Sequence, residues 1–265
     1  GNLNSYLVDS SQFGFEPLLM NDTEKVYCYL PSMRGENPDK RHLNQFFHCE
    51  AEIKGTLEEL IPLIEGYIKA LSEALLGMPN IIDCMSLNSA QSKASLEEIL
   101  NITRFDRITF NDACDILVKN GKENLINVTE HGRDITSKGE IELLTLLGKT
   151  TPLWVTHYDR DRVAFYQKPD SQDSSKVLNA DLLFPTLIIG SFGGEIVGCG
   201  QRQDSVDEMY QSLERQGVSP ESYEWYIHLR SLPNYSTTSG FGLGLERFIT
   251  WALCRDDIKD STIYP

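Results

Sequence analysis

The sequence predicts an α+β fold in which an antiparallel β-sheet is flanked by helices. Helical segments separate runs that have strand-like composition, namely residues 5–9, 26–54, 153–157, 162–166, 177–187 and 194–200. These runs do not alternate regularly with helices, as parallel βαβ units would, so we expect mainly antiparallel pairing. At 265 residues and 40% hydrophobic composition, residues 1–265 can form a single domain with a sizeable core.

The helices are predicted from capping and spacing signals. Thr56-Leu57-Glu58-Glu59 is a capping box, and apolar residues at helical spacing continue from it to about Gly77. Shorter helices are expected at 96–100, 112–119, 138–147, 205–216 and 220–229. The strands at 153–157 and 162–166 are expected to form a pair that brackets Asp159-Arg160-Asp161. A glycine-rich strand and an apolar helix are expected near the C-terminal end.

A hairpin with charged residues is predicted in the first quarter of the chain. The β-rich runs 26–30 and 46–53 are joined by a polar, proline-containing loop, which is typical of an antiparallel hairpin. Residues at even spacing share one face of a strand, so Arg34 and Glu36 are expected to point the same way. Such a pair suits a ligand that has both phosphates and an amine-bearing base. An ordinary surface ion pair is the alternative.

Three alternate glycines precede an arginine near the end of the chain. Gly240, Gly242 and Gly244 carry no Cβ, so their backbone can lie close against a flat group. Arg247 then begins the apolar stretch 248–253, which is typical of a buried helix. An arginine at this place can cover a planar ring or reach a phosphate oxygen. A glycine-rich turn with a capping ion pair is the alternative.

The hairpin and the glycine segment resemble motifs 2 and 3 of class II aminoacyl-tRNA synthetases, most closely those of the asparaginyl enzymes. Three further segments match in the same order, so that five matches span residues 10 to 247. These segments are Ser10-Ser11-Gln12, Glu50-Ala51-Glu52, and the stretch from Asp181 to Arg202 that contains Gly194-Glu195-Ile196. The resemblance implies a class II catalytic-domain fold, with an antiparallel sheet flanked by helices.

The resemblance also implies an adenylate-forming ligase that binds ATP. In this family the substrate carboxylate attacks ATP, so the protein positions the reactants and neutralises charge. Arg34 would hold the α-phosphate and Arg247 would cover the adenine, and these two are the implied catalytic residues. The further ATP-binding residues implied are Glu36 for the adenine amino group, Phe46 beneath the adenine, and Arg41 and His42 for the terminal phosphates.

A metal ion and an amino-acid pocket are implied as well. Glu195 and Asp181 would hold Mg²⁺ through oxygen ligands, which this ion prefers; for Asp181 a surface carboxylate at a strand end is the alternative. The substrate-binding residues implied are Glu50 for the ammonium, Ser10 and Gln12 at the same end, and Arg202 for the side chain of Asn or Asp. For Arg202, a surface arginine at a strand end is the alternative.

Charge and composition bear on the partners. The formal net charge is −15, with 24 basic residues against 39 acidic ones, which weighs against tRNA because RNA phosphates require basic surfaces. There is no run of 18 apolar residues and no signal peptide, so we expect a soluble cytoplasmic protein with no membrane partner. Six scattered cysteines without a C-x-x-C pair argue against zinc or a disulfide framework. The family implies a homodimer.

The departures from the family pattern lie around the substrate. Thr238 replaces a histidine, and His48 and Cys49 stand at positions that are usually apolar. The family's motif 1 and anticodon-binding domain do not occur in the chain, which is either a fragment or a compact relative. These observations favour a paralogue that adenylates an Asp- or Asn-like carboxylate, releases pyrophosphate and transfers the acyl group to ammonia or another small amine.

Two alternatives remain open. The first is the catalytic domain of a genuine asparaginyl-tRNA synthetase that charges tRNA. The second is a catalytically silent pseudo-synthetase that acts as a sensor or scaffold. Retention of Arg34, Glu36, Glu195 and Arg247 argues against the silent relative, which would have no need of all four.

Overall fold

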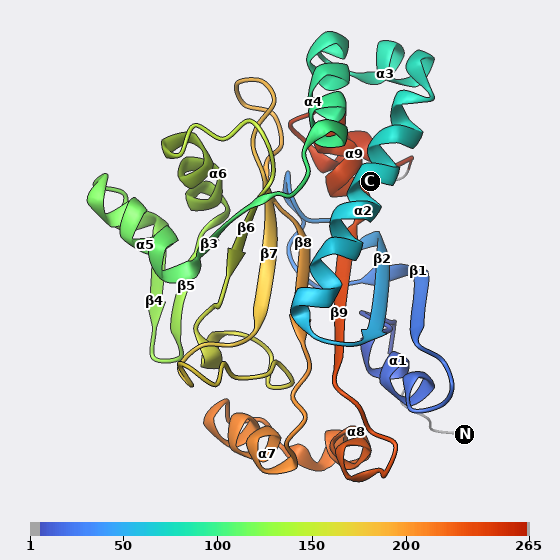
Figure 1. Ribbon diagram of the computed structural model, residues 1–265. Coiled ribbons are helices and arrows are strands. Elements are labelled where there is room, and N and C mark those ends of the chain that lie inside the picture. Colours follow the sequence, from blue (N-terminus) through green and yellow to red (C-terminus); the bar gives the residue numbers. More distant parts are fainter. Residues whose placement is uncertain (1–5, 264–265) are drawn as a thin grey trace.

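The computed structural model describes residues 6–263, in which one large sheet is flanked by helices (Figure 1). The predicted α+β class is confirmed. The strand order is β1-β2-β9-β8-β7-β6-β3, and neighbouring strands are antiparallel except for β6 and β3, which are parallel. The strands are β1 (Lys25–Met33), β2 (Gln45–Lys54), β3 (Asp106–Thr109), β6 (Leu153–Thr156), β7 (Asn179–Phe184), β8 (Gly194–Gln201) and β9 (Thr238–Gly244). A separate hairpin consists of β4 (Ile126–Thr129) and β5 (Gly132–Ile135).

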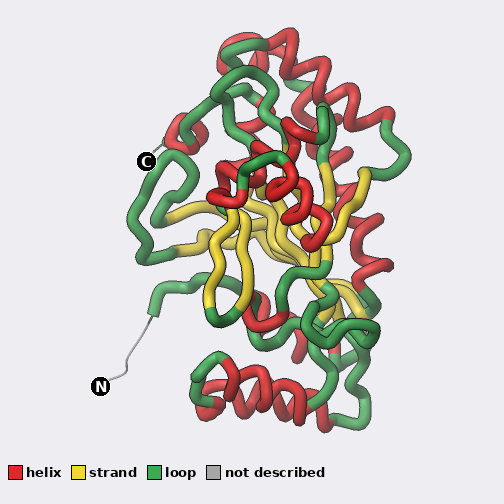
Figure 2. The backbone as a smooth tube through the Cα atoms, turned by 90° about the vertical axis from the view of Figure 1, so that its left-hand side faces the viewer, coloured by secondary structure: helices red, strands yellow, loops and turns green. Residues whose placement is uncertain are grey.

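The helices lie around this sheet in three groups (Figures 1 and 2). One group contains α2 (Leu57–Leu76), α3 (Pro79–Met85), α4 (Ser89–Asn101) and α9 (Leu245–Ala252). A second contains α5 (Phe110–Lys119) and α6 (Ser137–Leu146) beside the β4–β5 hairpin, and a third contains α7 (Val206–Arg215) and α8 (Glu224–His228). Helix α1 (Gln12–Leu19) lies near β1 and β2. No helix in the described part of the chain is long and apolar enough to cross a bilayer.

The capping box at the start of α2 is confirmed. The backbone N–H of Thr56 donates to Oε2 of Glu59 at 2.8 Å, and the Thr56 hydroxyl contacts the same carboxylate at 2.9 Å. The apolar side of α2, with Ile61, Ile64 and Ile68 fully buried, packs into the main core cluster. The predicted helix is therefore formed because its apolar residues share one face and its first turn is capped locally.

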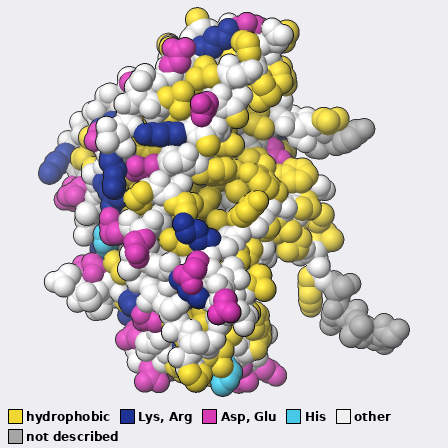
Figure 3. All heavy atoms as spheres, turned by 45° about the vertical axis from the view of Figure 1, so that its right-hand side comes forward, with side chains coloured by type: hydrophobic (Ala, Val, Ile, Leu, Met, Phe, Trp, Pro, Cys, Tyr) yellow, Lys and Arg dark blue, Asp and Glu magenta, His cyan; other side chains and the backbone are white. Residues whose placement is uncertain are grey.

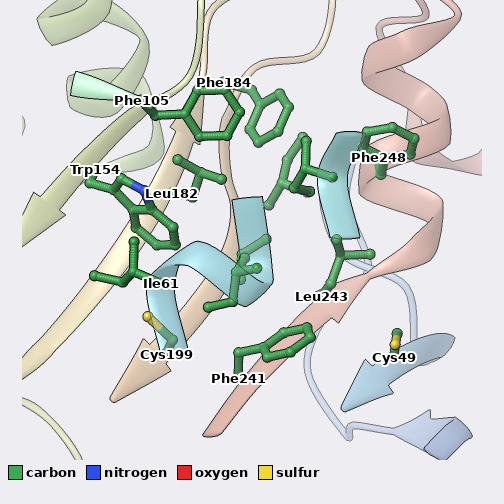
Figure 4. Packing of buried hydrophobic residues seen from close by; sticks show 14 of the residues in the cluster. Cys49, Ile61, Phe105, Trp154, Leu182, Phe184, Cys199, Phe241, Leu243 and Phe248 are labelled. Carbon is green, nitrogen blue, oxygen red and sulfur yellow. The ribbon is translucent and has the colours of Figure 1, made fainter. Parts of the chain in front are cut away.

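The two faces of the sheet differ in composition. Successive residues of a strand point to opposite faces. On one face Cys49, Leu182, Phe241 and Leu243 pack with α2 residues in a closed apolar core (Figure 4). The residues between them on β2 and β9 are charged residues or glycines, and they line two pockets on the other face. The alternation along β2 and β9 therefore places polar side chains and bare backbone together on the face opposite α2.

Two strand predictions are wrong. Residues 6–9 form no strand, and residue 5 lies outside the described residues. Residues 162–166 form no strand either, and β6 pairs instead with β3 and β7. The apolar character of 162–166 has another cause, since Phe165 is buried against Met209, Leu213 and Tyr226 beneath α7 and α8.

The remaining differences concern elements that are short or fragmented. The predicted helix at 220–229 is divided into a 3-10 turn (Pro220–Tyr223), α8 and a second 3-10 turn (Leu229–Ser231). Four further features were not predicted from the sequence, namely α1, α3, β3 and the β4–β5 hairpin. Strand β3 has only four residues, and none of them is buried, so its local pattern carries little hydrophobic signal.

Candidate active site

A cleft lies where the β1–β2 hairpin meets β9 and α9. We call it the arginine cleft, because Arg34, Arg41 and Arg247 line it. The six residues that the sequence analysis assigned to ATP all line this cleft, together with Glu195; the other lining residues include Leu43, His48, Ile196, Gly242, Gly244, Glu246 and Ile258. Segments that are about 200 residues apart in the chain are thus brought together.

The loop of the hairpin holds its charged residues through backbone contacts. Arg34 and Glu36 lie just beyond β1, so the expectation that they share one face of a strand is wrong, although both line the cleft. The Asn44 side-chain amide donates to the carbonyl of Arg34 at 2.9 Å and to that of Glu36 at 2.6 Å. The Arg34 N–H donates back to the Asn44 carbonyl at 2.9 Å. Asn44, which the sequence analysis did not single out, therefore closes the loop.

The three arginines come from two parts of the chain, since Arg34 and Arg41 follow β1 and Arg247 lies on α9. The Arg34 guanidinium lies 5.3 Å from the Phe46 ring centroid and pairs with Asp9 at 2.9 Å. The Arg247 Nη1 donates to Oε2 of Glu195 at 3.1 Å, and its aliphatic stem lies against Gly244, where a Cβ would meet it at 3.4–3.6 Å. Arg34 and Arg247 thus both line the cleft, each held by a carboxylate partner.

Arg41 is the most enclosed of the three arginines. Its guanidinium stacks on the Phe192 ring at 4.5 Å, donates to the carbonyl of Gly193 and lies 3.8 Å from Glu140. His42, by contrast, is half-exposed, and its Nδ1 contacts Asp39 at 2.8 Å. Phe46 packs edge-on against the His48 ring at 4.6 Å. Arg41 and His42 of the loop and Phe46 of β2 thus line the same cleft.

Three carboxylates meet behind the arginines. Burial would raise the pKa of Glu195, but Arg247 and Arg41 outweigh it and lower that pKa. Burial and the nearby Glu195 raise the pKa of Asp181 well above its usual value. Burial and Glu195 likewise raise the pKa of Glu140 to about 7. Glu140, on α6, accepts a hydrogen bond from the Glu195 N–H at 2.9 Å and was not identified from the sequence, because nothing in its local pattern connects it with Glu195.

The donor set fits Mg²⁺. An oxygen of Asp181 and an oxygen of Glu195 each lie 3.4 Å from the position that a Cβ on Gly198 would occupy. The two carboxylates therefore lie close together over this glycine of β8. In the described part of the chain, no group of three or more His, Cys, Asp or Glu side chains is arranged around a metal position. Mg²⁺ commonly takes one or two carboxylates and completes its shell with phosphates and water, so two suffice.

A second pocket adjoins the arginine cleft. We call it the amide pocket; it has a volume of about 280 Å³ and shares Gly242 with the cleft. Its lining includes Gln12, Glu50 and Arg202 from the predicted substrate site, and Asp181. Ser10 does not line it, but its hydroxyl donates to Oε1 of Glu50 at 2.7 Å. Of the predicted substrate residues, three therefore line one pocket and the fourth supports it.

The far end of the amide pocket is a buried ion pair. Arg202 donates from Nε and Nη2 to the two oxygens of Glu52, at 2.7 and 2.8 Å, and both side chains are 5% exposed or less. The surface alternative for Arg202 is therefore wrong. Burial alone would lower the pKa of Arg202, but Glu52 raises it above its usual value. Gly240 makes the pair possible, because a Cβ there would overlap the Glu52 carboxylate.

Glu50 lies at the end of the amide pocket that faces the cleft. Its carboxylate accepts from the hydroxyl and N–H of Ser11 as well as from Ser10, and it lies 3.4 Å from Nδ1 of His48. Burial opposes ionisation, yet hydrogen bonds from His48, Ser11 and Ser10 lower the pKa of Glu50 to about 2. Glu50 is consequently an ionised acceptor suited to an ammonium group.

Comparison with known proteins identifies the family to which the chain is similar. The family model described as tRNA synthetases class II (D, K and N) matches residues 2–265. The asparagine–tRNA ligase of Thermococcus kodakarensis is 33% identical, over 98% of this chain and 57% of the relative. That of Lactococcus lactis is 30% identical, over 91% and 52%. The crystal structure of asparaginyl-tRNA synthetase from Pyrococcus horikoshii complexed with asparaginyl-adenylate has a TM-score of 0.84 and 30% identity, over 98% of this chain and 58% of that chain.

The chain therefore spans just over half the length of the relatives it matches. The family model nonetheless covers nearly the whole chain, and the similar structure shares its fold. These matches show that the chain belongs to the class II tRNA synthetases of the D, K and N group.

Proposed function

We propose that this chain is a catalytic domain that activates asparagine with ATP and transfers it to tRNA. The observation that carries the proposal is that the arginine cleft and the amide pocket meet over Gly242. A nucleotide in the cleft and an amino acid in the pocket would place the reacting phosphate and carboxylate side by side. The reaction forms an asparaginyl-adenylate and releases pyrophosphate.

Charge and position account for the step. Glu50 binds the substrate ammonium, with Ser10 and Gln12 at the same end. Arg34 binds the α-phosphate and neutralises the charge that grows on it as the carboxylate oxygen attacks and pyrophosphate departs. Arg247 and Phe46 enclose the adenine, and the remaining cleft residues, Glu36, Arg41 and His42, bind its amino group and the terminal phosphates.

Glu195 and Asp181 are the residues that would hold Mg²⁺, which supplies charge neutralisation to the leaving pyrophosphate when it is bound. Both carboxylates flank Gly198, on the strand next to the one that carries Gly242. Arg247 contacts Glu195 directly, so the metal-binding carboxylate also orients the arginine over the nucleotide.

The charge balance of the amide pocket favours asparagine over aspartate. Glu52 already neutralises Arg202, so the far end of the pocket has no net positive charge left for a carboxylate. Glu50, over Gly242, and the Arg202–Glu52 pair, over Gly240, are two strand residues apart, or about 7 Å. This span suits a short side chain that ends in a neutral polar group. The relatives quoted above are named asparagine–tRNA ligases.

The acceptor separates this proposal from a second candidate. The net charge of −15 favours a paralogue that transfers the acyl group to ammonia or another small amine. The names of the relatives favour tRNA. The two differ in one measurement, since AMP release with asparagine or aspartate should require tRNA in the first case and a free amine in the second.

The experiment has two parts. Pyrophosphate exchange into ATP should be seen with asparagine, and at least ten times more weakly with aspartate. AMP release should then rise on addition of tRNA and not on addition of ammonium. Exchange without any tRNA effect, combined with AMP release driven by ammonium, would replace this proposal with the paralogue. Absence of exchange across all amino acids would leave the silent pseudo-synthetase.

We also propose a homodimer, because the protein exposes an apolar surface around β1. Strand β1 is an edge strand, and its Tyr27 and Tyr29 are 74% and 53% exposed, beside Phe47 of β2 at 45%. Hydrophobic side chains gather over the side of the molecule on which β1 lies (Figures 1 and 3). A second copy would cover these rings, and light scattering of wild type and of Tyr27→Glu would test it.

A further inference from the structure

Gln167 is a polar side chain in the amide pocket to which the function proposed above gives no role. It lies in the segment between β6 and β7, forms an isolated β-bridge with Arg202 and lines the pocket. Its Oε1 is buried and has no hydrogen-bond partner within the protein. A buried carbonyl oxygen that lacks a donor costs free energy in the empty pocket, so a ligand that supplies a donor is favoured there.

A second glycine makes room for this side chain. A Cβ on Gly200 would overlap the carboxamide oxygen of Gln167 and would lie 2.7 Å from its Cδ. Gly200 is the cross-strand partner of Gly240, the glycine that lies beneath the Arg202–Glu52 pair. The Gln167 carboxamide and the ion pair therefore lie on adjacent glycines at the same end of the pocket. Their arrangement depends on both glycines lacking a Cβ.

The hydrogen-bonding groups at this end complement a side-chain amide. A guanidinium has five N–H donors, and the contacts with Glu52 use two of those on Arg202. Arg202 can thus still donate to a carbonyl oxygen, and Gln167 Oε1 can accept from an N–H. A carboxamide provides both a carbonyl oxygen and N–H donors, whereas a carboxylate provides acceptors alone.

We propose that Gln167 is a specificity-determining residue, whose Oε1 accepts a hydrogen bond from the side-chain amide of the amino-acid substrate. The inference rests on the proposed function, because it takes the amide pocket to be the amino-acid site. Gln167 accepts a hydrogen bond from the amide nitrogen, and Arg202 donates one to the amide oxygen. With the carboxamide oriented as it is in the structure, a carboxylate would offer Oε1 no donor and would not form this hydrogen bond.

The test replaces Gln167 with a side chain of similar length that has no carbonyl oxygen and accepts hydrogen bonds only weakly. For Gln167→Met we expect kcat/KM for asparagine in pyrophosphate exchange to fall about tenfold, mainly through KM, because one hydrogen bond to the substrate is lost. The activity with aspartate should change less than threefold, so the ratio between the two substrates falls. Gln172→Met is the matched control, since Gln172 is exposed in the same segment and does not line the pocket.

A second variant removes the same contact without changing Gln167. In Gly200→Ala the new Cβ would displace the carboxamide, which is the end of a flexible side chain, so the protein should still fold. We expect a similar loss with asparagine, and the double variant should be no worse than either single one because both remove one interaction. Calorimetric titration with asparagine alone would follow the same contact without catalysis.

The outcomes separate the two proposals. Wild-type exchange with asparagine that Gln167→Met retains within twofold would overturn the role of Gln167 and leave the proposed function intact. Equal losses with asparagine and aspartate would also overturn it, because a contact to the amide alone cannot affect both. Wild-type protein that neither binds nor activates asparagine would overturn the function and the role together.

Discussion

The arginine cleft and the amide pocket use arginine in opposite ways. In the cleft, the Arg34 side chain is 43% exposed and its partner Asp9 is 63% exposed, so its charge remains available to a ligand. In the amide pocket, Arg202 is 5% exposed and binds both oxygens of the fully buried Glu52. The cleft thus leaves cations open for a polyanion, whereas the pocket neutralises its charges internally. We expect substitutions in the cleft to cost activity and substitutions in the pocket to cost stability as well.

The largest effect should come from breaking the buried pair. Arg202→Met leaves the Glu52 carboxylate buried without a partner, so we expect the free energy of unfolding to fall by about 3–5 kcal/mol. Urea denaturation followed by circular dichroism measures it. The double variant Arg202→Met/Glu52→Leu should regain more than half of the loss, because no buried charge remains. A loss below about 1 kcal/mol in the single variant would show that the pair is not structural.

A substitution in the arginine cleft should lower activity and leave the free energy of unfolding almost unchanged. Arg34→Met should lower kcat for pyrophosphate exchange about 100- to 1000-fold, because charge that grows on the α-phosphate loses its partner. Its free energy of unfolding should change by less than about 1 kcal/mol, since Arg34 forms an exposed ion pair. Arg162→Met is the matched control, with 44% exposure and a 2.7 Å pair to Asp134 outside both pockets. Equal activity of the two variants would contradict the role of Arg34.

Acid should reduce the stability that Glu50 contributes to the fold at the place where the two pockets meet. The pKa of Glu50 lies at about 2 against an ordinary value of 4.5, so the stability it contributes is present above pH 4.5 and is lost as the pH falls toward 2. Between pH 5 and pH 3, wild type should lose on the order of 1–2 kcal/mol relative to Glu50→Gln, after allowance for screening. Unfolding free energies of both proteins across this range measure it. A difference that is independent of pH would mean that Glu50 is not held ionised.

The smallest effect concerns the loop that carries Arg34. Asn44→Ala removes two hydrogen bonds to the backbone of Arg34 and Glu36, so the loop should be held less firmly. We expect KM for ATP to rise about fivefold to tenfold, with kcat reduced less. Asn101→Ala removes a comparable bond to the Glu97 carbonyl at the end of α4, and it should leave KM for ATP unchanged. If both variants behave alike, the loop contacts do not serve the cleft.

Much of this architecture could be predicted from local patterns. The capping box of α2 requires only four neighbouring residues, and the β1–β2 hairpin requires two strand-like runs with a polar loop between them. The predicted ATP-binding residues all line one cleft. They could be predicted because they belong to segments whose resemblance to a family can be recognised from the residues themselves. The erroneous strand at 162–166 shows the limit, since burial of Phe165 in a helical cluster gives the same apolar pattern as a strand.

The fold class, the hairpin, the glycine-rich strand and the charged residues that line the site could all be predicted from the amino-acid sequence. Three contacts became known from the folded structure instead: Glu52 neutralises Arg202, Glu140 supports Glu195, and Gln167 lies over Gly200. Each of these pairs joins residues that are 33 to 150 positions apart. A local pattern records which face of a strand or helix a side chain occupies, but the partner across the pocket depends on how the strands are ordered in the sheet.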